Sequence, residues 1–267
     1  MEATVPLPVL VPDVRAFRCT NDGLRACIKE HFVIGRTERG KSEWWARGKV
    51  WRSGPGSIQV KEPGDVHRDI ARDGPTTFTV IVLPTSEITD LRAAGKVVGL
   101  PHLEPSDARA QPFHRLHDAV VGGADRLSVE VAVAEAVATF ASLQDERSAH
   151  SRPVRRAVEY LRERLADPIS LDDLAHHASL DKFHLCRAFR AQIGMPPHAY
   201  LTHLRVIRAK ALLKQGVRAT DVAPRVGLYD QSQLNRHFRR IVGTTPARYG
   251  IEKQSEGARG LGSVLSR

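Results

Sequence analysis

The sequence has few cysteines, and none of them is arranged for a structural role. Its 267 residues include three, Cys19, Cys27 and Cys186, which are widely spaced and form no C-x-x-C pair. This pattern argues against a disulfide framework and against a structural zinc site. We expect free thiols in a reducing compartment, namely the cytoplasm of a prokaryote.

Long hydrophobic runs are also missing. No stretch approaches the ~20 apolar residues that a membrane-spanning helix needs, and the first residues, MEATVPLPVLVPDV, lack a basic start and are interrupted by prolines. We therefore expect no signal peptide and no membrane partner. The hydrophobic content of 42% and the charged content of 26% are ordinary for a globular protein. The length favours two domains, at about 100–200 residues each.

Acidic residues are scarce in one part of the chain only. Residues 151–250 contain 18 Lys and Arg against 8 Asp and Glu, whereas residues 1–150 contain 19 against 20. The basic excess of the whole chain thus lies in one segment. Such an asymmetry indicates a polyanionic partner, most simply nucleic acid.

The basic segment contains one sequence unit twice. DKFHLCRAFRAQIGMPPHAY begins at Asp181, and DQSQLNRHFRRIVGTTPARY begins at Asp230, 49 residues later. In each copy an Asp starts a helical pattern of apolar residues that ends at a glycine, Gly194 or Gly243. A shorter amphipathic helix precedes each copy, the first capped by Ser170 and the second by Thr220 or Asp221. The pattern predicts two helix-turn-helix units, over 171–194 and 220–243.

The second helix of each unit carries polar side chains beside its apolar stripe. Arg contacts guanine, and Gln or Asn contacts adenine, in the major groove of DNA. A solvated helix face is the alternative, but an Arg recurs at the same place in both copies. The candidate DNA-binding residues are Lys182, Phe183, Cys186, Arg187 and Arg190 in the first unit, and Gln231, Ser232, Gln233, Asn235, Arg236 and Arg239 in the second.

A helical pattern between the copies, PPHAYLTHLRVIRAKALLKQG, can hold the two units apart. Leu201, Leu204, Ile207, Ala211 and Leu212 form its expected apolar stripe. About 17 helical residues span roughly 25 Å, and successive major grooves on one face of DNA lie about 34 Å apart. One chain can thus place two helices in successive grooves.

Residues 150–250 resemble the DNA-binding domain of the AraC/XylS family of transcription regulators. The resemblance rests on SLDDLA, FHLCRAFRAQIGMPPHAYL and DVAPRVGLYDQSQLNRHFRRIVGTTPARY. It implies base contacts from Phe183, Cys186 and Arg187 in the first unit and from Gln231, Ser232, Gln233 and Arg236 in the second. It also implies promoter DNA and RNA polymerase as partners. Asp181, Leu228 and Gly250 depart from the usual family pattern.

The front part of the chain has the sequence pattern of an all-β domain. ACIKEHFVIG, SEWWARGKVW, GSIQVKE and TFTVIVLP are short β-type runs between turn-rich segments. GPGSIQVKEPGDVH resembles the cupin-type sensor domains that precede this DNA-binding domain in many family members. A barrel of this size holds one small molecule, and the candidate effector-binding residues are Arg25, His31, Trp44, Trp51 and His67, each of which ordinary packing or structural hydrogen bonding also explains.

Residues 112–146 are expected to be helical. Val129, Val133, Ala136, Val137, Phe140 and Leu143 form an apolar stripe that either packs on the barrel or joins two subunits through residues 128–143. The predicted organisation is a cupin-like barrel with trailing helices over 1–143, a linker over 144–153, an all-α DNA-binding domain over 154–250 and a disordered tail over 251–267.

Two other classes of function compete with a ligand-controlled transcription regulator. A cupin enzyme needs an H-x-H pair with a carboxylate and a later His, and the sequence has no H-x-H. Glu30 and His31, expected to be neighbours on a strand, would point to opposite faces. We therefore expect no catalysis, no metal and no cofactor. An architectural DNA-binding protein would show little sequence preference, whereas the Arg and Gln faces favour base contacts.

Overall fold

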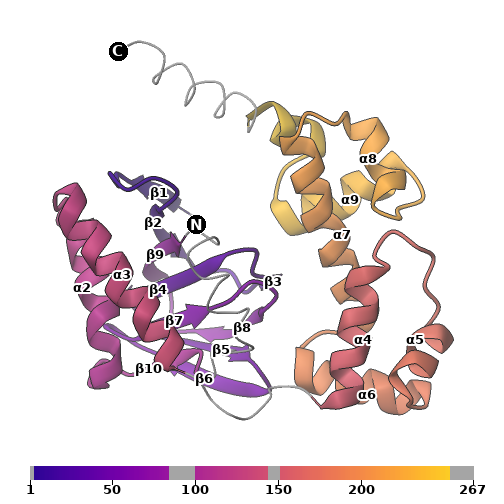
Figure 1. Cartoon of the computed structure of the whole chain (residues 1–267), viewed down its shortest axis with the longest axis horizontal. Helices are drawn as coiled ribbons and strands as arrows, with labels where there is room; N and C mark the ends of the chain where they lie inside the picture. Colours follow the sequence, from indigo (N-terminus) through magenta and orange to yellow (C-terminus); the bar gives the residue numbers. More distant parts are fainter. Residues whose placement is uncertain (1–2, 84–99, 144–150, 253–267) are drawn as a thin grey trace. The chain divides into compact units, whose positions relative to one another are not determined.

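The chain folds into two compact units that divide between residues 150 and 151. The computed structural model describes residues 3–83, 100–143 and 151–252 (Figure 1). The first unit is a β-structure followed by helices and the second is helical, which confirms the predicted fold class. Each unit is described separately below.

The first unit contains two antiparallel sheets. The six-stranded sheet has the order β1–β2–β9–β4–β7–β10, and the four-stranded sheet has the order β3–β8–β5–β6. The strands are β1 (Ala3–Leu7), β2 (Arg15–Asn21), β3 (Ala26–Ile28), β4 (Phe32–Arg39), β5 (Ser42–Ala46), β6 (Lys49–Ser53), β7 (Ile58–Lys61), β8 (Val66–Arg72), β9 (Thr76–Leu83) and β10 (His102–Leu103).

Three details differ from the sequence prediction. β1 lies in the proline-containing start of the chain, which was not expected to be a strand. It is an edge strand of the sheet, and an edge tolerates Pro6 because the missing N–H removes no hydrogen bond from the sheet interior. Glu30 and His31 lie in the connection between β3 and β4, so the argument from opposite strand faces does not apply to them. β8 and β10 were not predicted, because their sequences show no clear alternation of apolar and polar residues.

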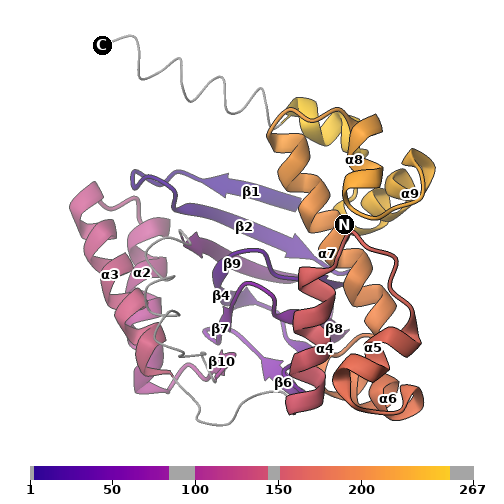
Figure 2. The same cartoon turned by 45° about the vertical axis from the view of Figure 1, so that its right-hand side comes forward.

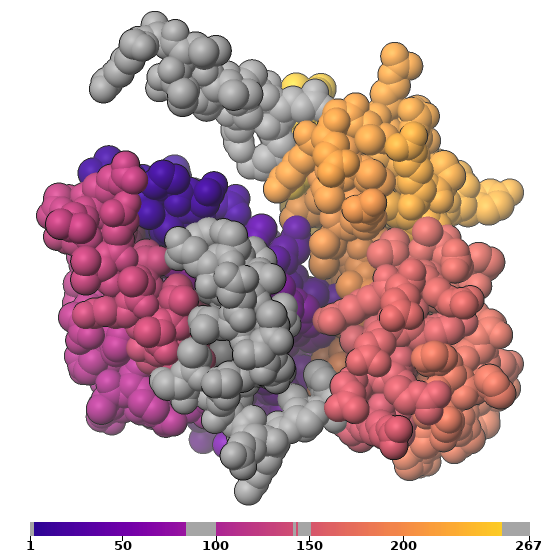
Figure 3. Space-filling model, viewed as in Figure 1, coloured from indigo at the N-terminus to yellow at the C-terminus, as the bar shows by residue number. Residues whose placement is uncertain are grey.

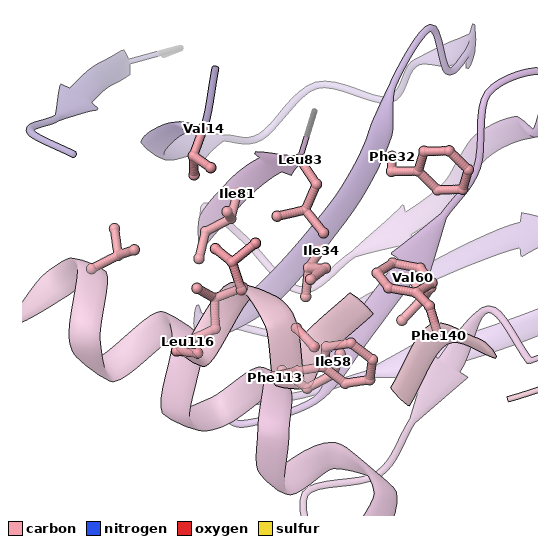
Figure 4. Close-up of a cluster of buried hydrophobic side chains, with 14 of the residues drawn as sticks. Val14, Phe32, Ile34, Ile58, Val60, Ile81, Leu83, Phe113, Leu116 and Phe140 are labelled. Carbon is pink, nitrogen blue, oxygen red and sulfur yellow. The ribbon is translucent and has the colours of Figure 1, made fainter. Parts of the chain in front are cut away.

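The helices of the first unit cover the outer face of the six-stranded sheet. α2 (Gln111–Val121) follows the short helix η1 (Ala108–Ala110), and α3 (Arg126–Ser142) follows a turn that Asp125 caps. Both helices lie on the same side of the sheet (Figure 2). Phe113, Leu116 and Phe140 pack against Ile34, Ile58 and Ile81 of the strands (Figure 4). The apolar stripe predicted for residues 128–143 thus packs on its own domain.

The second compact unit is helical: α4 (Arg152–Glu163) comes first, and two helix-turn-helix units with a helix between them follow. The helices after α4 are α5 (Leu171–Ala178), α6 (Lys182–Ile193), α7 (Pro197–Lys214), α8 (Ala219–Arg225) and α9 (Gln231–Val242). The residues of the first and second helix-turn-helix units form two neighbouring lobes (Figure 3). The predicted linker residues Arg152 and Pro153 belong to α4, and the earlier part of that linker lies outside the described residues.

Three expectations for the second unit were wrong in detail. The N-cap of α8 is Arg218, without a side-chain hydrogen bond, and neither Thr220 nor Asp221 takes that place. α7 buries Val206, Ala209 and Leu213 together with Leu212, because it packs against helices on more than one side, so its buried face is not the single stripe that we predicted. Residues 251–252 of the predicted tail continue a helix that begins at residue 246.

Candidate functional site

The first helix-turn-helix unit is stabilised by hydrogen bonds at both helix starts. The Ser170 hydroxyl accepts from the N–H of Asp173 while the Asp173 carboxylate accepts from the N–H of Ser170, a capping box. Asp181 Oδ1 accepts from the N–H groups of Phe183 (3.0 Å) and His184 (2.9 Å), and these bonds lower the pKa of Asp181. The second helix, α6, therefore starts at a defined residue.

α6 is anchored by its apolar face and leaves the opposite face in solvent. Leu185, Phe189 and Ile193 are buried. Phe183 is 73% exposed, an unusual state for a large apolar ring. Lys182, Arg187 and Arg190 are exposed and Cys186 is half-buried. Lys182 Nζ lies 3.3 Å from the carboxylate of Asp172 on α5, so this cation already has a partner.

The second helix-turn-helix unit repeats the arrangement around α9. Asp230 accepts from the N–H of Gln233 (2.7 Å), and Gly243, with φ +88°, ends the helix. Leu234 and Phe238 are buried, and the Phe238 ring meets Tyr249 edge-on at 5.4 Å. The exposed residues are Gln231, Ser232, Arg236 and Arg239, whereas Gln233 and Asn235 are half-buried.

Gln233 has a structural bond that sequence analysis did not foresee. Its side-chain Oε1 accepts from the N–H of Tyr229 at 2.8 Å, across the start of α9. Asp230 thus accepts from the N–H of Gln233, while the Gln233 side chain accepts from the N–H of the residue that precedes Asp230. The signal was available in the sequence, because a Gln three residues after an Asp N-cap is a capping-box pattern. Tyr229, which precedes the cap, is 93% exposed.

Arg187 and Arg236 occupy the same place in the two units. Each is exposed, and each lies six residues after the Asp that caps its helix. The surrounding charge is positive, since residues 151–250 hold 18 Lys and Arg against 8 Asp and Glu. Two capped helices with equivalent exposed guanidinium groups suit a polyanion with a repeating groove.

The loop between α4 and α5 contacts the turn of the second helix-turn-helix unit. Gly227, with φ +73°, lies so close to Ala166 that an added Cβ would be 2.5 Å from the Ala166 carbonyl oxygen. Beside it, Arg205 on α7 donates from Nε to the carbonyl of Leu165 (2.8 Å) and from Nη2 to that of Asp167 (2.9 Å). The loop after α4 is thus fixed to α7 and to the second unit.

In the first compact unit, which contains the two sheets, three of the five candidate effector residues come together. The Trp44 ring is 5.0 Å from the His67 ring and 6.4 Å from the Trp51 ring. Arg25 is exposed and its backbone N–H donates to Asp69 (3.2 Å). His31 lies in the β3–β4 connection.

Other residues of this cluster were missed. The His102 ring lies 6.2 Å from Trp44 and 5.8 Å from Trp51, and Lys61 Nζ lies 5.4 Å from the Trp44 ring. The Trp44 indole N–H donates to Ser53 (2.8 Å). Gln59 and Lys61 alternate with Ile58 and Val60 in the sequence of β7, and this alternation is the signal that could have placed Lys61 on the inner face.

A cavity of about 500 Å³ opens at one end of the four-stranded sheet. Ser53 and Arg72 line it, together with Lys41, Ser42 and Glu104. This volume suits a small molecule. No three His, Cys, Asp or Glu side chains of the described residues gather as metal ligands would.

Comparison with known proteins assigns both units. Residues 174–250 match a model described as a helix-turn-helix domain, and residues 17–138 match one described as an AraC-like ligand binding domain. The chain is an AraC-family transcription regulator. It binds DNA through its helical second compact unit and carries a ligand-binding domain in its β-rich first compact unit.

Two relatives agree with this assignment, and one solved structure shares the fold. The regulator is 28% identical over 218 residues to the uncharacterised HTH-type transcriptional regulator YbfI of Bacillus subtilis, covering 77% of this chain and 79% of that protein. It is 32% identical over 88 residues to the transcriptional activator AarP of Providencia stuartii, covering 33% of this chain and 65% of that protein. The structure of ToxT from Vibrio cholerae O395 has the same fold, with a TM-score of 0.52 at 12% identity over 90% of this chain and 97% of that one.

The described helices of the regulator include none that could cross a membrane.

Proposed function

We propose that the regulator recognises an asymmetric operator by inserting α6 and α9 into successive major grooves. The observation that carries the proposal is the equivalent placement of Arg187 and Arg236 on two exposed, N-capped helices. α7, which runs between the units, has 18 residues and is therefore about 27 Å long. This length is compatible with grooves about 34 Å apart.

The exposed residues divide into two roles. Arg187 and Arg236 donate to guanine, Gln231 and Asn235 bond to adenine, and the exposed ring of Phe183 contacts a thymine methyl group. Gln233 contributes mainly to the cap of α9, because its Oε1 is already used. The residues that contact phosphates or lie beside the bases are Lys182, Cys186, Arg190, Ser232 and Arg239.

The first unit controls the second through a small-molecule effector. Binding between the two sheets, against Trp44, Trp51 and His67, shifts the population of states that bind the operator. The regulator performs no catalysis and needs no metal. It works in the cytoplasm, where it contacts RNA polymerase at the promoter.

A second copy of the chain is a further partner. The stripe of α3 that faces the sheet is buried, but Leu127 and Val131, one turn apart, are 68% and 52% exposed. Neighbouring apolar side chains of this size on one helix face favour helix pairing. We infer that two chains pair through this outer face of α3.

Selection of bound sequences from a random DNA pool, with the full-length protein at near-physiological salt, tests the proposal. Two short preferred blocks about one helical turn apart are expected. One block would restrict base contacts to a single helix. Selection of no sequence by the full chain, together with none by residues 150–267, would refute sequence-specific recognition; enrichment by the fragment alone would show that the full chain needs its effector.

A further inference from the structure

The inner faces of the two sheets in the ligand-binding unit are not closed by apolar packing. On the outer face of the six-stranded sheet, Ile34, Val60 and Ile81 are 0–1% exposed beneath the helices. Their neighbours on the inner face, Val33 and Val82, are only half-buried. Apolar side chains that face another sheet and stay half-buried indicate space between the sheets.

The strand register defines which residues line this space. Lys61 is paired with Val33, and Val33 with Val82, so these three side chains form one row on the inner face. The next row contains Gln59, Gly35 and Val80 in the same way. Gly35 contributes no side chain to its row. An ammonium group is thus set at the end of an apolar row.

The opposite sheet contributes Trp44 and His67, which lie beside Lys61. Trp44 is fully buried, and its ring lies 5.0 Å from His67 and 5.4 Å from Lys61 Nζ. The His102 ring of the six-stranded sheet lies 6.2 Å from the Trp44 ring, edge-on. Trp44 therefore marks where the two sheets meet, beside the Lys61 ammonium group.

Lys61 has no carboxylate partner within the described residues. The carboxylate that acts on Lys61 electrostatically, Asp69, is already engaged, because it accepts from His67 Nε2 (3.0 Å) and pairs with Arg72 (2.9 Å). Two other cations, Lys29 and Arg72, also act on Lys61. The net charge of the groups around the Lys61 ammonium group is therefore positive. Desolvation and the neighbouring Lys29 charge lower the pKa of Lys61 to about 7.

Two further polar atoms in the same network lack a hydrogen-bond partner. These are His67 Nδ1 and Arg72 Nη1, on side chains that are 10% and 6% exposed. Burial, with the Lys61 charge, lowers the pKa of His67 to about 3, so the ring is neutral. With its Nε2 bonded to Asp69, Nδ1 is left as a lone-pair acceptor. Buried polar atoms of this kind are normally satisfied, and several at one place indicate a ligand.

We propose that the effector is a small organic carboxylate, whose carboxylate pairs with Lys61 and whose apolar body lies along Val33 and Val82. The proposal rests on the proposed function, since it names the class of effector that controls DNA binding. A carboxylate offsets the positive balance that Asp69 leaves. A hydroxyl or N–H on the same molecule can donate to His67 Nδ1. Sugars and other neutral ligands satisfy the polar atoms but not the ammonium group.

Tryptophan fluorescence of the full-length protein gives a direct readout. All three tryptophans, Trp44, Trp45 and Trp51, lie on β5 and β6, so the signal reports on the ligand-binding unit alone. The probes are benzoate, phenylacetate, hexanoate and decanoate, each titrated beside its uncharged primary amide. At least one carboxylate is expected to bind tenfold or more tightly than its amide.

Two variants connect the preference to Lys61. Lys61→Met keeps the length of the side chain and should abolish the preference for the carboxylate while the amide binds as before. Arg109→Met removes a surface cation of the same unit, 55% exposed and paired with Asp107, and should leave the preference intact. Gly35→Val places methyl groups between the sheets, where its Cβ meets Gln59 at 3.7 Å, and should weaken the carboxylate and the amide alike.

The inference fails if no carboxylate binds more tightly than its amide, or if Lys61→Met retains the preference. Operator selection by the same variants shows that they are folded. A protein that selects an operator but ignores every carboxylate would leave the proposed regulator in place and remove only this inference. A protein that binds carboxylates through Lys61 but selects no operator would support this inference and refute the proposed sequence-specific regulation.

Discussion

At the scale of single residues, we expect DNA recognition to depend on guanidinium groups that are exposed on helix surfaces. Arg236 is exposed on α9, and Phe238 two residues later is fully buried. Neighbouring residues of one helix therefore serve recognition and stability separately. Substitutions at the two positions should have effects of different kinds.

Arg236→Ala is expected to weaken operator binding by about 1–3 kcal/mol and to relax specificity at one operator position, because a bidentate contact with guanine is lost. Binding to operators changed one base pair at a time would measure this. Arg248→Ala is the control, since Arg248 is exposed and paired with Glu252. Equal weakening on every DNA sequence would contradict a base contact.

Effector binding should depend on pH through Lys61. Its pKa of about 7 means that it loses its charge as the pH rises past neutrality. Carboxylate binding should therefore weaken as pH rises, by up to about tenfold per unit above 7, and change little below 6. His67 stays neutral and Asp69 stays ionised over this range. The other groups that act on Lys61 are Lys29, Arg72 and Cys27.

Titration of one carboxylate between pH 5.5 and 8.5 would measure this dependence. Lys61→Arg, which keeps its charge, should flatten it. Tighter binding at high pH would contradict the assignment of Lys61.

Sequence analysis identified Arg187 and Arg236 because a repeat exposes equivalent positions without any knowledge of packing. It listed Gln233 as a DNA-binding residue although the spacing from Asp230 offered a capping pattern, and only the structure shows that Gln233 accepts from the backbone N–H of Tyr229. The alternation in β7 could have placed Lys61 on the inner face, but the approach of Lys61 and His102 to Trp44 depends on the register of β7 and β10 and on the packing of two sheets. Long-range pairing of this kind leaves no local pattern.

At the scale of elements, the recognition helices depend on a few buried aromatic anchors. Phe238→Ala should lower the free energy of unfolding by about 3–5 kcal/mol, since the ring is 0% exposed and packs on Tyr249. Chemical denaturation followed by circular dichroism would measure the change. Phe183→Ala is the matched control, because the Phe183 ring is exposed and its loss should leave stability nearly unchanged.

α3 has one face on its own sheet and another in solvent. A Leu127→Glu, Val131→Glu double variant should shift the protein from dimer to monomer in sedimentation velocity, because two carboxylates would enter the paired surface. Glu130→Gln, on the same helix, is the control: it removes a negative charge, whereas the double variant adds two, and it should leave the dimer intact. A wild-type protein that is monomeric at micromolar concentration would exclude pairing through α3.

The helices were easier to predict than the strands, for a physical reason. The apolar spacing of Leu185, Phe189 and Ile193 is local and repeats in the second copy, so α6 and α9 follow from the sequence. α7 was predicted as a helix, but of its buried residues only Leu212 was in the predicted stripe, because neighbours on several sides determine which residues are buried. β8 and β10 are defined by their partners more than by their own residues.

At the scale of the whole molecule, charge and recognition coincide. The basic excess falls in residues 151–250, which also contain both recognition helices. Phosphate contacts from this surface make affinity depend steeply on salt, whereas base contacts set the preference among sequences. The domain limits predicted at residues 143, 153 and 250 remain predictions.

The contact between Gly227 and Ala166 should fix the spacing of the two helix-turn-helix units. Gly227→Ala would force a Cβ to within 2.5 Å of a backbone oxygen and strain a residue with φ +73°. We expect a lower melting temperature and weaker binding to the selected two-block operator. Binding to each block alone, at high protein concentration, should be retained. Unchanged affinity for the two-block operator would show that this contact does not set the spacing.

A fixed spacing has a consequence for finding the genes under control. One base pair inserted between the two blocks moves the second by about 3.4 Å and turns it by about a tenth of a helical turn. Rigidly joined units cannot follow that displacement, so natural operators should vary in their bases while keeping one distance between blocks. A genome search can therefore demand an invariant gap, which removes most chance matches to two short sequences.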